Sequence, residues 1–407
     1  MAAVDAQFYW MSTKVHNDDF MLYAFDGEAA DVGRAMEQLR GRARACPDLT
    51  ARVRDGSVLT YPQWVPADVG PDSVVHRHLA DSSWDGCLDA VAGLVDDQLD
   101  MREMSWRIYV FAPVHGIPGA SGPGTVAVMQ VPHALADGVR AAALAAWIFG
   151  RPAPVPEVPR PPTGFLPWRA VAAARAHRLL VRDTDAGLLA PGVGYRPPLP
   201  TNARPQGARS LRTLVRQRSQ LPGPTVTVAV LSAVSSALSG LFGAAADALG
   251  AEVPMAKPGV RQAHNHFGNV VVGLYPELDP AARRERIAAD LTNGRRRFEH
   301  PGPRSTDRAL AAMPAALLRW GVSLFDPHVR PAQVLGNTVV SSINRGPADL
   351  RFGEAPVVLA GSCPALGPTI GLSHGVHGIG ETIAVSVHAA ASAVDIDDYV
   401  DRLDAAL

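Results

Sequence analysis

The stretch TVAVMQVPHALADGVRAAALAAWIF, residues 125–149, determines how the rest of the chain is interpreted. Its first seven residues are mostly β-branched and other apolar side chains, as in a buried strand, and Pro132 cannot continue the ladder of backbone hydrogen bonds. From Gly138 onward, bulky side chains return at helical spacing in an alanine-rich background. The sequence therefore predicts a strand, a short turn and a helix, with His133 and Asp137 in the turn.

His133 has the chemistry of a general base. A neutral imidazole just beyond a strand can take a proton from an alcohol, an amine or a thiol. Asp137, at the start of the helix, can cap backbone N–H groups or pair with an arginine from another segment, and Gly138 permits close approach of two backbones. From these residues alone, a structural histidine is the more common interpretation of such a pair.

The composition limits the size, the partners and the compartment that we expect for the protein. With 407 residues, of which 47% are hydrophobic, the chain has ample material for two large lobes. Its 38 Lys and Arg residues against 39 Asp and Glu give no electrostatic reason to expect nucleic acid as a partner. The three cysteines lie far apart and the first residues lack a basic-then-apolar run, so we expect a cytoplasmic protein with free thiols.

One segment, residues 222–246, contains no charged residue and is long enough to cross a bilayer. Serine and threonine side chains are scattered through it, however, and its opening TVTVAVL is typical of a strand. We therefore predict a buried strand followed by a helix within a soluble protein.

Strands and helices alternate on both sides of a proline-rich break, RPAPVPEVPRPPTG, at residues 151–164. We expect an N-terminal lobe over 1–150, a linker with a basic amphipathic helix over 151–200, and a C-terminal lobe over 201–407. The helix, expected at 166–182, either covers the protein's own apolar surface, which we favour, or lies on a membrane surface. The fold class is α/β (α+β), with two lobes of mixed sheet and helices around a shared cleft.

Other histidines have simpler explanations. His264-Asn265-His266 is most simply a polar turn. His374 and His377 lie in a glycine-rich stretch and lack cysteine or carboxylate partners, so no metal site is assigned. Residues 373–380 are expected to form either a flexible rim loop or a substrate gate.

HALADG resembles the HHxxxDG motif of the chloramphenicol acetyltransferase and peptide-condensation superfamily. The whole chain resembles one branch of it, the wax ester synthase/diacylglycerol acyltransferase family. The similar segments run in order along nearly the entire chain: VDAQFYWM (4–11), FDG (25–27), LTYPQWV (59–65), VVHRHL (74–79), LDMREMSW (99–106), TNARPQGARSL (201–211), HFGNVV (266–271) and NTVVSSINRGP (337–347).

The resemblance implies a fold of two chloramphenicol-acetyltransferase-like lobes around a central active-site tunnel. It also implies acyl transfer from a thioester to a hydroxyl acceptor, with His133 as general base and no covalent acyl-enzyme. Coenzyme A or a carrier protein would present the acyl group as a co-substrate, and no bound cofactor is expected. Asp137 and Gly138 complete the implied catalytic motif.

The remaining site residues are assigned from their positions. Asp137 would pair with a cation across the fold, with Arg261 as first choice and Lys257 as second. Both residues precede the strand expected to contain Gly268 and Asn269. Ser342 and Asn344, or backbone N–H groups around Gly138, are candidates to bind the oxyanion or the substrate.

Three departures from the family pattern leave other functions open. Pro132 replaces the first histidine of the doublet, Met104-Ser105 replace a Pro-Leu pair, and Thr227-Val228 stand where an Asn-Asp pair is usual. One alternative is an amide-forming condensation enzyme of specialised metabolism. The other is a catalytically inactive binding or scaffold protein of the same fold.

Overall fold

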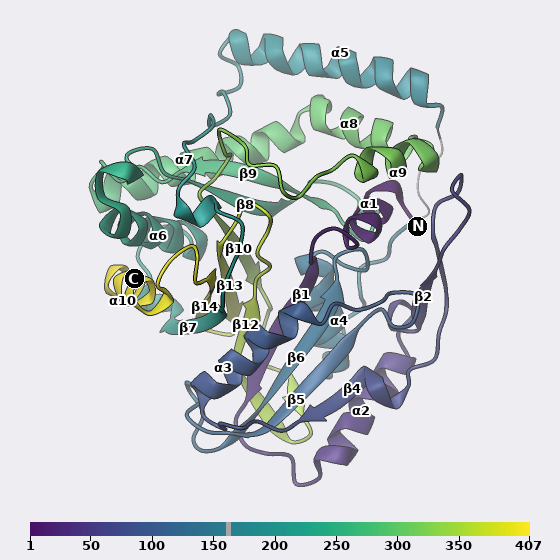
Figure 1. Cartoon of the computed structure of the whole chain (residues 1–407), viewed down its shortest axis with the longest axis vertical. Helices are drawn as coiled ribbons and strands as arrows, with labels where there is room; N and C mark the ends of the chain where they lie inside the picture. The colour runs from purple at the N-terminus through teal and green to yellow at the C-terminus, as the bar shows by residue number, and fades with distance from the viewer. Residues whose placement is uncertain (160–163) are drawn as a thin grey trace.

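The computed structural model describes residues 1–159 and 164–407. It contains two six-stranded mixed sheets and a short two-stranded hairpin (Figure 1). The first sheet has the order β11-β12-β1-β6-β5-β4, and the second has the order β7-β14-β13-β10-β8-β9. The predicted two-lobed α/β fold with mixed sheets is confirmed.

Each sheet gathers strands that lie far apart in the sequence. The first contains β1 (Asp18–Phe25), β4 (Val74–Arg77), β5 (Arg107–Val114), β6 (Gly124–Pro132), β11 (Arg351–Phe352) and β12 (Ala355–Cys363). The second contains β7 (Arg209–Gln217), β8 (Gly250–Ala256), β9 (Phe267–Gly273), β10 (Thr338–Asn344), β13 (Leu372–Ile379) and β14 (Thr382–Ala390). The hairpin is β2 (Ala51–Arg54) with β3 (Gln63–Pro66).

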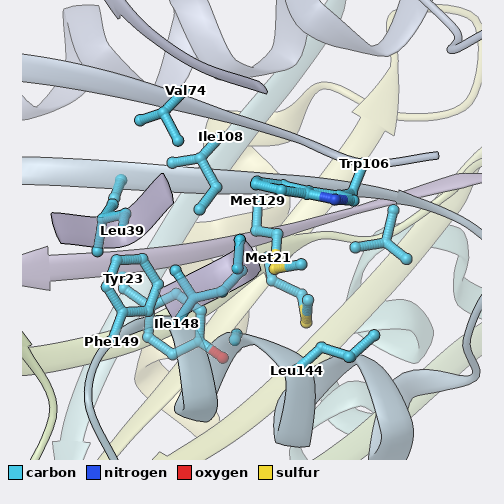
Figure 2. Packing of buried hydrophobic residues seen from close by; sticks show 14 of the residues in the cluster. Met21, Tyr23, Leu39, Val74, Trp106, Ile108, Met129, Leu144, Ile148 and Phe149 are labelled. Atoms are coloured by element: carbon cyan, nitrogen blue, oxygen red, sulfur yellow. The ribbon is translucent and has the colours of Figure 1, made fainter. Parts of the chain in front are cut away.

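The helices pack on the two sheets and on one another. They are α1 (Ala3–Met11), α2 (Val32–Arg44), α3 (Trp84–Gly93), α4 (Gly138–Ile148), α5 (Leu166–Asp185), α6 (Val226–Phe242), α7 (Pro280–Glu299), α8 (Pro301–Ala311), α9 (Ala315–Ser323) and α10 (Ile396–Ala406). Figure 2 shows the core in which α4 and α2 meet the first sheet, with Leu144 and Ile148 packed near Met21, Tyr23 and Met129. A separate core joins α6, α7 and α10 to the second sheet.

The expected lobe boundaries do not follow the sheets. The segment β11–β12 lies within the expected C-terminal lobe of residues 201–407, yet β12 pairs antiparallel with β1 and completes the first sheet. The chain thus crosses from the second sheet to the first after β10 and returns at β13. This crossover ties the two lobes together and brings the end of β10 against the N-terminal lobe.

The uncharged segment 222–246 differs from the prediction of a strand followed by a helix. Its TVTVAVL portion belongs to α6, because the Thr225 hydroxyl accepts a hydrogen bond from the N–H of Val228 and caps the helix. Burial of α6 among α7, α10 and the second sheet overrides the strand preference of its β-branched residues. No helix in the described residues is both long and apolar enough to cross a membrane.

Residues 373–380 are also neither a rim loop nor a gate loop. They lie almost entirely in β13, which pairs with β10 on one edge and with β14 on the other and is almost entirely buried. His374 is held there by Thr338 Oγ1 at 3.1 Å and by the Tyr399 hydroxyl at 2.7 Å. Glycines in this segment permit close packing of neighbouring strands: a Cβ at Gly375 would lie 2.1 Å from Ser362 Oγ.

The basic helix is present as α5 and packs against α8, at the edge of the molecule in Figure 1. Its outward face leaves Trp168, Val171 and Val181 exposed. Residues 160–163 of the expected linker lie outside the described part of the chain.

Candidate active site

The turn between β6 and α4 holds His133 and Asp137 as the local sequence predicts. Pro132 is the last residue of β6, and Gly138 is the first residue of α4. Asp137 caps α4, because its Oδ1 accepts a hydrogen bond of 2.9 Å from the N–H of Arg140. The end of β6 therefore places His133 at the junction of the lobes, and the helix cap holds the end of the turn in position.

The Asp137 carboxylate is buried and fully engaged. Arg261 donates two hydrogen bonds to it, at 2.9 and 3.1 Å, and the N–H of His266 donates a third at 2.8 Å. Lys257, the second choice for this pair, instead binds Asp307 at 2.7 Å. Asp137 thus joins α4 to residues 261–266 of the C-terminal lobe and has no free oxygen lone pair positioned for proton transfer.

His133 is oriented by Asn265. The Nδ1 atom of His133 lies 3.2 Å from Asn265 Oδ1. The amide Nδ2 of Asn265 donates to Asp5 Oδ1 at 2.9 Å and to the His133 carbonyl at 2.7 Å. Both of those partners are acceptors, so the amide oxygen must face the imidazole and Nδ1 must carry the proton. The lone pair of His133 is therefore on Nε2.

Two aromatic rings fix the plane of that imidazole. His133 stacks against Phe8 of α1, with ring centroids 4.7 Å apart, and against Phe267 of β9 at 5.5 Å. Its Nε2 atom lies 3.8 Å from the Asp19 carboxylate, on the side of the ring opposite the bond to Asn265. The side chain remains 21% exposed, so a substrate can reach it.

Asp5 supports Asn265 from α1. Its buried carboxylate accepts hydrogen bonds from the N–H groups of His264 and Asn265, at 3.0 and 2.9 Å, and from the Asn265 amide. Burial raises the pKa of Asp5 to about 6, although these hydrogen bonds act in the opposite direction. The turn at 264–266, expected only as a polar turn, is thus a part of the site that the sequence did not reveal.

A cavity of about 630 Å³ lies between the lobes and includes His133, Asp137, Gly138 and Ser342 in its lining. Thr227 also lines it and donates a hydrogen bond of 2.9 Å to Ser342 Oγ, which leaves the Ser342 hydroxyl proton free to point at a ligand. Gly138 packs closely against Ile343: a Cβ there would lie 2.3 Å from Ile343 Cδ1, so the Ile343 side chain would have to move.

Asn344 does not take part in this cavity. It ends β10 as an exposed residue, and its Oδ1 accepts a hydrogen bond of 2.8 Å from the N–H of Gly346. Its assignment as a substrate or oxyanion contact is therefore corrected. The described residues contain no cluster of three or more histidine, cysteine or acidic side chains arranged to hold a metal ion.

Solved structures with the same overall architecture show the class of fold. A wax ester synthase/diacylglycerol acyltransferase from Marinobacter aquaeolei VT8 superposes with a TM-score of 0.62 at 14% identity, covering 99% of this chain and 96% of that one. The first condensation domain of the CDA synthetase gives 0.60 at 16% identity, covering 99% and 93%. A starter condensation domain of rhizomide synthetase, in complex with C8-CoA and Leu-SNAC, gives 0.60 at 12%, covering 99% and 91%.

The chain therefore has the two-lobed fold shared by these wax ester synthase and condensation-domain structures. No family model and no curated protein matches its sequence.

Proposed function

We propose that this protein transfers an acyl group from a thioester to a hydroxyl acceptor, with His133 as the general base. The observation that carries the proposal is the hydrogen bond between His133 Nδ1 and Asn265 Oδ1, which leaves the lone pair on Nε2 at the interlobe cavity. A base must present its lone pair, within reach of the proton that it abstracts.

In the proposed reaction, Nε2 of His133 takes the hydroxyl proton as the acceptor oxygen attacks the thioester carbonyl carbon. The new C–O bond forms, and the carbonyl oxygen becomes an oxyanion. Collapse of this tetrahedral species breaks the C–S bond, and the imidazolium returns the proton to the leaving thiolate. The products are an ester and a free thiol, and no acyl-enzyme forms.

Two donors are available for the oxyanion. The N–H of Gly138 is at the first position of α4, where it has no carbonyl acceptor within the helix and lies at the positive end of the helix dipole. The hydroxyl of Ser342, on β10, lines the same cavity and accepts a hydrogen bond from Thr227. Preorganised donors of this kind stabilise charge that develops only in the transition state.

We further propose acyl-CoA as the donor. A second cavity, of about 360 Å³, is lined by Asn265 and His266 of the 264–266 turn and by Arg304 and Arg308, beside the ion pair of Lys257 with Asp307. Clustered cationic side chains suit the phosphates of coenzyme A. A carrier protein would present the same thioester on a single phosphate, so these side chains are the feature that distinguishes the two donors.

An amine acceptor, giving an amide, is the second candidate, because condensation domains are among the structures with this fold. The inactive scaffold is less well supported, since the cavity beside His133 is open and not filled by side chains.

The direct test measures thiol release and product mass for the wild type and His133→Ala over a panel of acyl thioesters with alcohol and amine acceptors. We expect the substitution to lower the rate about a hundredfold or more. Unchanged product formation in His133→Ala would show that this histidine is not the base. Products formed only from amines would select the condensation reaction.

A further inference from the structure

Arg345 is a buried cation at the wall of the interlobe cavity. It follows β10 directly, its side chain lines the cavity, and the residue is only 4% exposed. Among residues 1–159 and 164–407, no aspartate or glutamate forms an ion pair with its guanidinium. A guanidinium removed from water without an anion is costly, so the position calls for a functional explanation.

The groups around Arg345 do not neutralise it. Its Nη1 atom donates to the Met21 thioether at 2.9 Å, which is a weak acceptor, and its Cζ lies 5.7 Å from the centroid of the Tyr23 ring. Its Nε atom is buried without a hydrogen-bond partner. The side chain therefore has unused donor capacity.

Its backbone, by contrast, is firmly held. The N–H of Arg345 donates to Gly378 O at 2.7 Å, and Arg151 donates to its carbonyl at 2.7 Å. Arg151 is itself paired with Asp349. The fold thus fixes the place from which the guanidinium extends.

A second polar pair lines the same wall. Ser362 of β12 lies opposite Met21 in the strand register, and its Oγ is 2.8 Å from His377 Nε2. The other ring nitrogen of His377 is buried without a partner. If Nε2 carries the proton and donates to Ser362, the Ser362 hydroxyl is free to donate into the cavity beside Arg345.

We propose that Arg345, with Ser362, binds a carboxylate on one of the two substrates. A planar guanidinium that can donate two parallel hydrogen bonds is suited to a carboxylate. This inference depends on the proposed acyl transfer in one respect: the ligand is taken to be a substrate of that reaction.

The position of the subsite relative to the base follows from β1. Asp19 faces His133 Nε2, and Met21 touches Arg345. These two residues are on one face of the strand and about 7 Å apart along it. The carboxylate would therefore lie several bonds from the reacting atom, and Asp19 would repel it from the base end of the cavity. The other arginine of the cavity lining, Arg295, is exposed on α7 and remains hydrated.

The test uses binding without turnover. Isothermal titration compares 4-hydroxybutyrate with 4-hydroxybutyramide for the acceptor, and the glutaryl thioester of N-acetylcysteamine with its terminal amide for the donor. We expect one carboxylate to bind at least tenfold more tightly than its amide to the wild type. That preference should disappear in Arg345→Met and persist in the surface control Arg351→Met. The pair that shows it identifies which substrate carries the carboxylate.

Thermal unfolding separates this role from a structural one. Removing an unpaired buried charge should raise the Tm of ligand-free Arg345→Met, whereas a structural arginine would give a lower Tm. If Arg345→Met does not fold, Arg345→Lys, which keeps the charge but loses the planar fork, should weaken the preference. Absence of any preference in the wild type, or its persistence in the variants, would overturn the proposal. Titration of His133→Ala keeps the question separate from acyl transfer, since this variant should retain the preference without activity.

Discussion

Asn265 Oδ1 lies 3.2 Å from His133 Nδ1, and the same amide donates to the carboxylate of Asp5. Three segments that are distant in the sequence therefore determine one proton position. Asp5 orients the Asn265 amide, the amide oxygen selects the His133 tautomer, and that tautomer leaves Nε2 free at the cavity. The predictions below follow from this arrangement and from the ion pairs around it.

Asn265→Ala should lower kcat about a hundredfold with little change in KM, because the imidazole loses the acceptor that fixes its tautomer and position. The pH profile of kcat should also move, since the proton on Nδ1 is no longer stabilised. Steady-state kinetics over a pH series provide the measurement. Asn269→Ala is the control: Asn269 lies in β9, just after the turn that holds Asn265, and donates a hydrogen bond to Glu252. This variant should behave like the wild type. Equal losses in both variants would contradict a positioning role for Asn265.

Asp137→Asn should destabilise the protein by about 3 kcal/mol or more, because it leaves Arg261 buried without its anion. Activity should fall with soluble yield, while the pH optimum of the remaining activity stays in place, since Asp137 does not carry the transferred proton. Urea unfolding and a pH–rate series measure the two effects. Asp307→Asn, which breaks the more exposed pair with Lys257, should cost no more than about 1 kcal/mol. A displaced pH optimum in Asp137→Asn would show that Asp137 takes part in proton transfer.

Stability should respond to the ionisation of Asp5 and Asp18. Burial raises the pKa of each carboxyl to about 6, above its value of 3.8 in the unfolded chain. Each group therefore favours the folded state most below pH 4, and this contribution is lost as the pH rises through 6. The loss is up to about 3 kcal/mol for each group.

Buried His264 opposes this trend, because burial lowers its pKa to about 4 and the folded state then loses stability as the pH falls below 6.5. The useful measurement is therefore the difference in unfolding free energy between the wild type and Asp18→Asn at pH 4 and pH 7. The variant should gain stability relative to the wild type as the pH rises. A difference that does not vary with pH would show that Asp18 has no raised pKa in the folded protein.

The double variant Arg304→Ala, Arg308→Ala should raise KM for acyl-CoA about tenfold, since each lost contact to a phosphate removes a charge-assisted hydrogen bond. KM for the same acyl group on N-acetylcysteamine, which has no phosphate, should not change. Initial rates with the two donors make the comparison. If both values of KM rise together, the second cavity does not bind the phosphates of coenzyme A.

Local sequence patterns were sufficient for individual strands and helices around the site. The strand ending at Pro132 and the helix beginning at Gly138 were predicted because a proline interrupts a ladder and a glycine-led alanine-rich run favours a helix. The α6 segment was predicted in part as a strand, because β-branched residues are ambiguous until burial on all sides and the Thr225 cap select the helix. The strand β13 was not recognised, since its histidines and glycines are polar or small and only their neighbours show that they are buried.

The sequence by itself determined the chemistry that is available: an imidazole at a strand end, an acid at a helix start and a second, distant segment with Arg261. Only the tertiary structure decided how these groups act. It placed Asn265 and Asp5 next to His133, and it paired Lys257 with Asp307 and not with Asp137. It also left Arg345 buried without a carboxylate partner. The reason is physical: hydrogen bonds and ion pairs depend on distances of about 3 Å between groups that are up to 324 residues apart. Spacing along the chain carries no information at that scale.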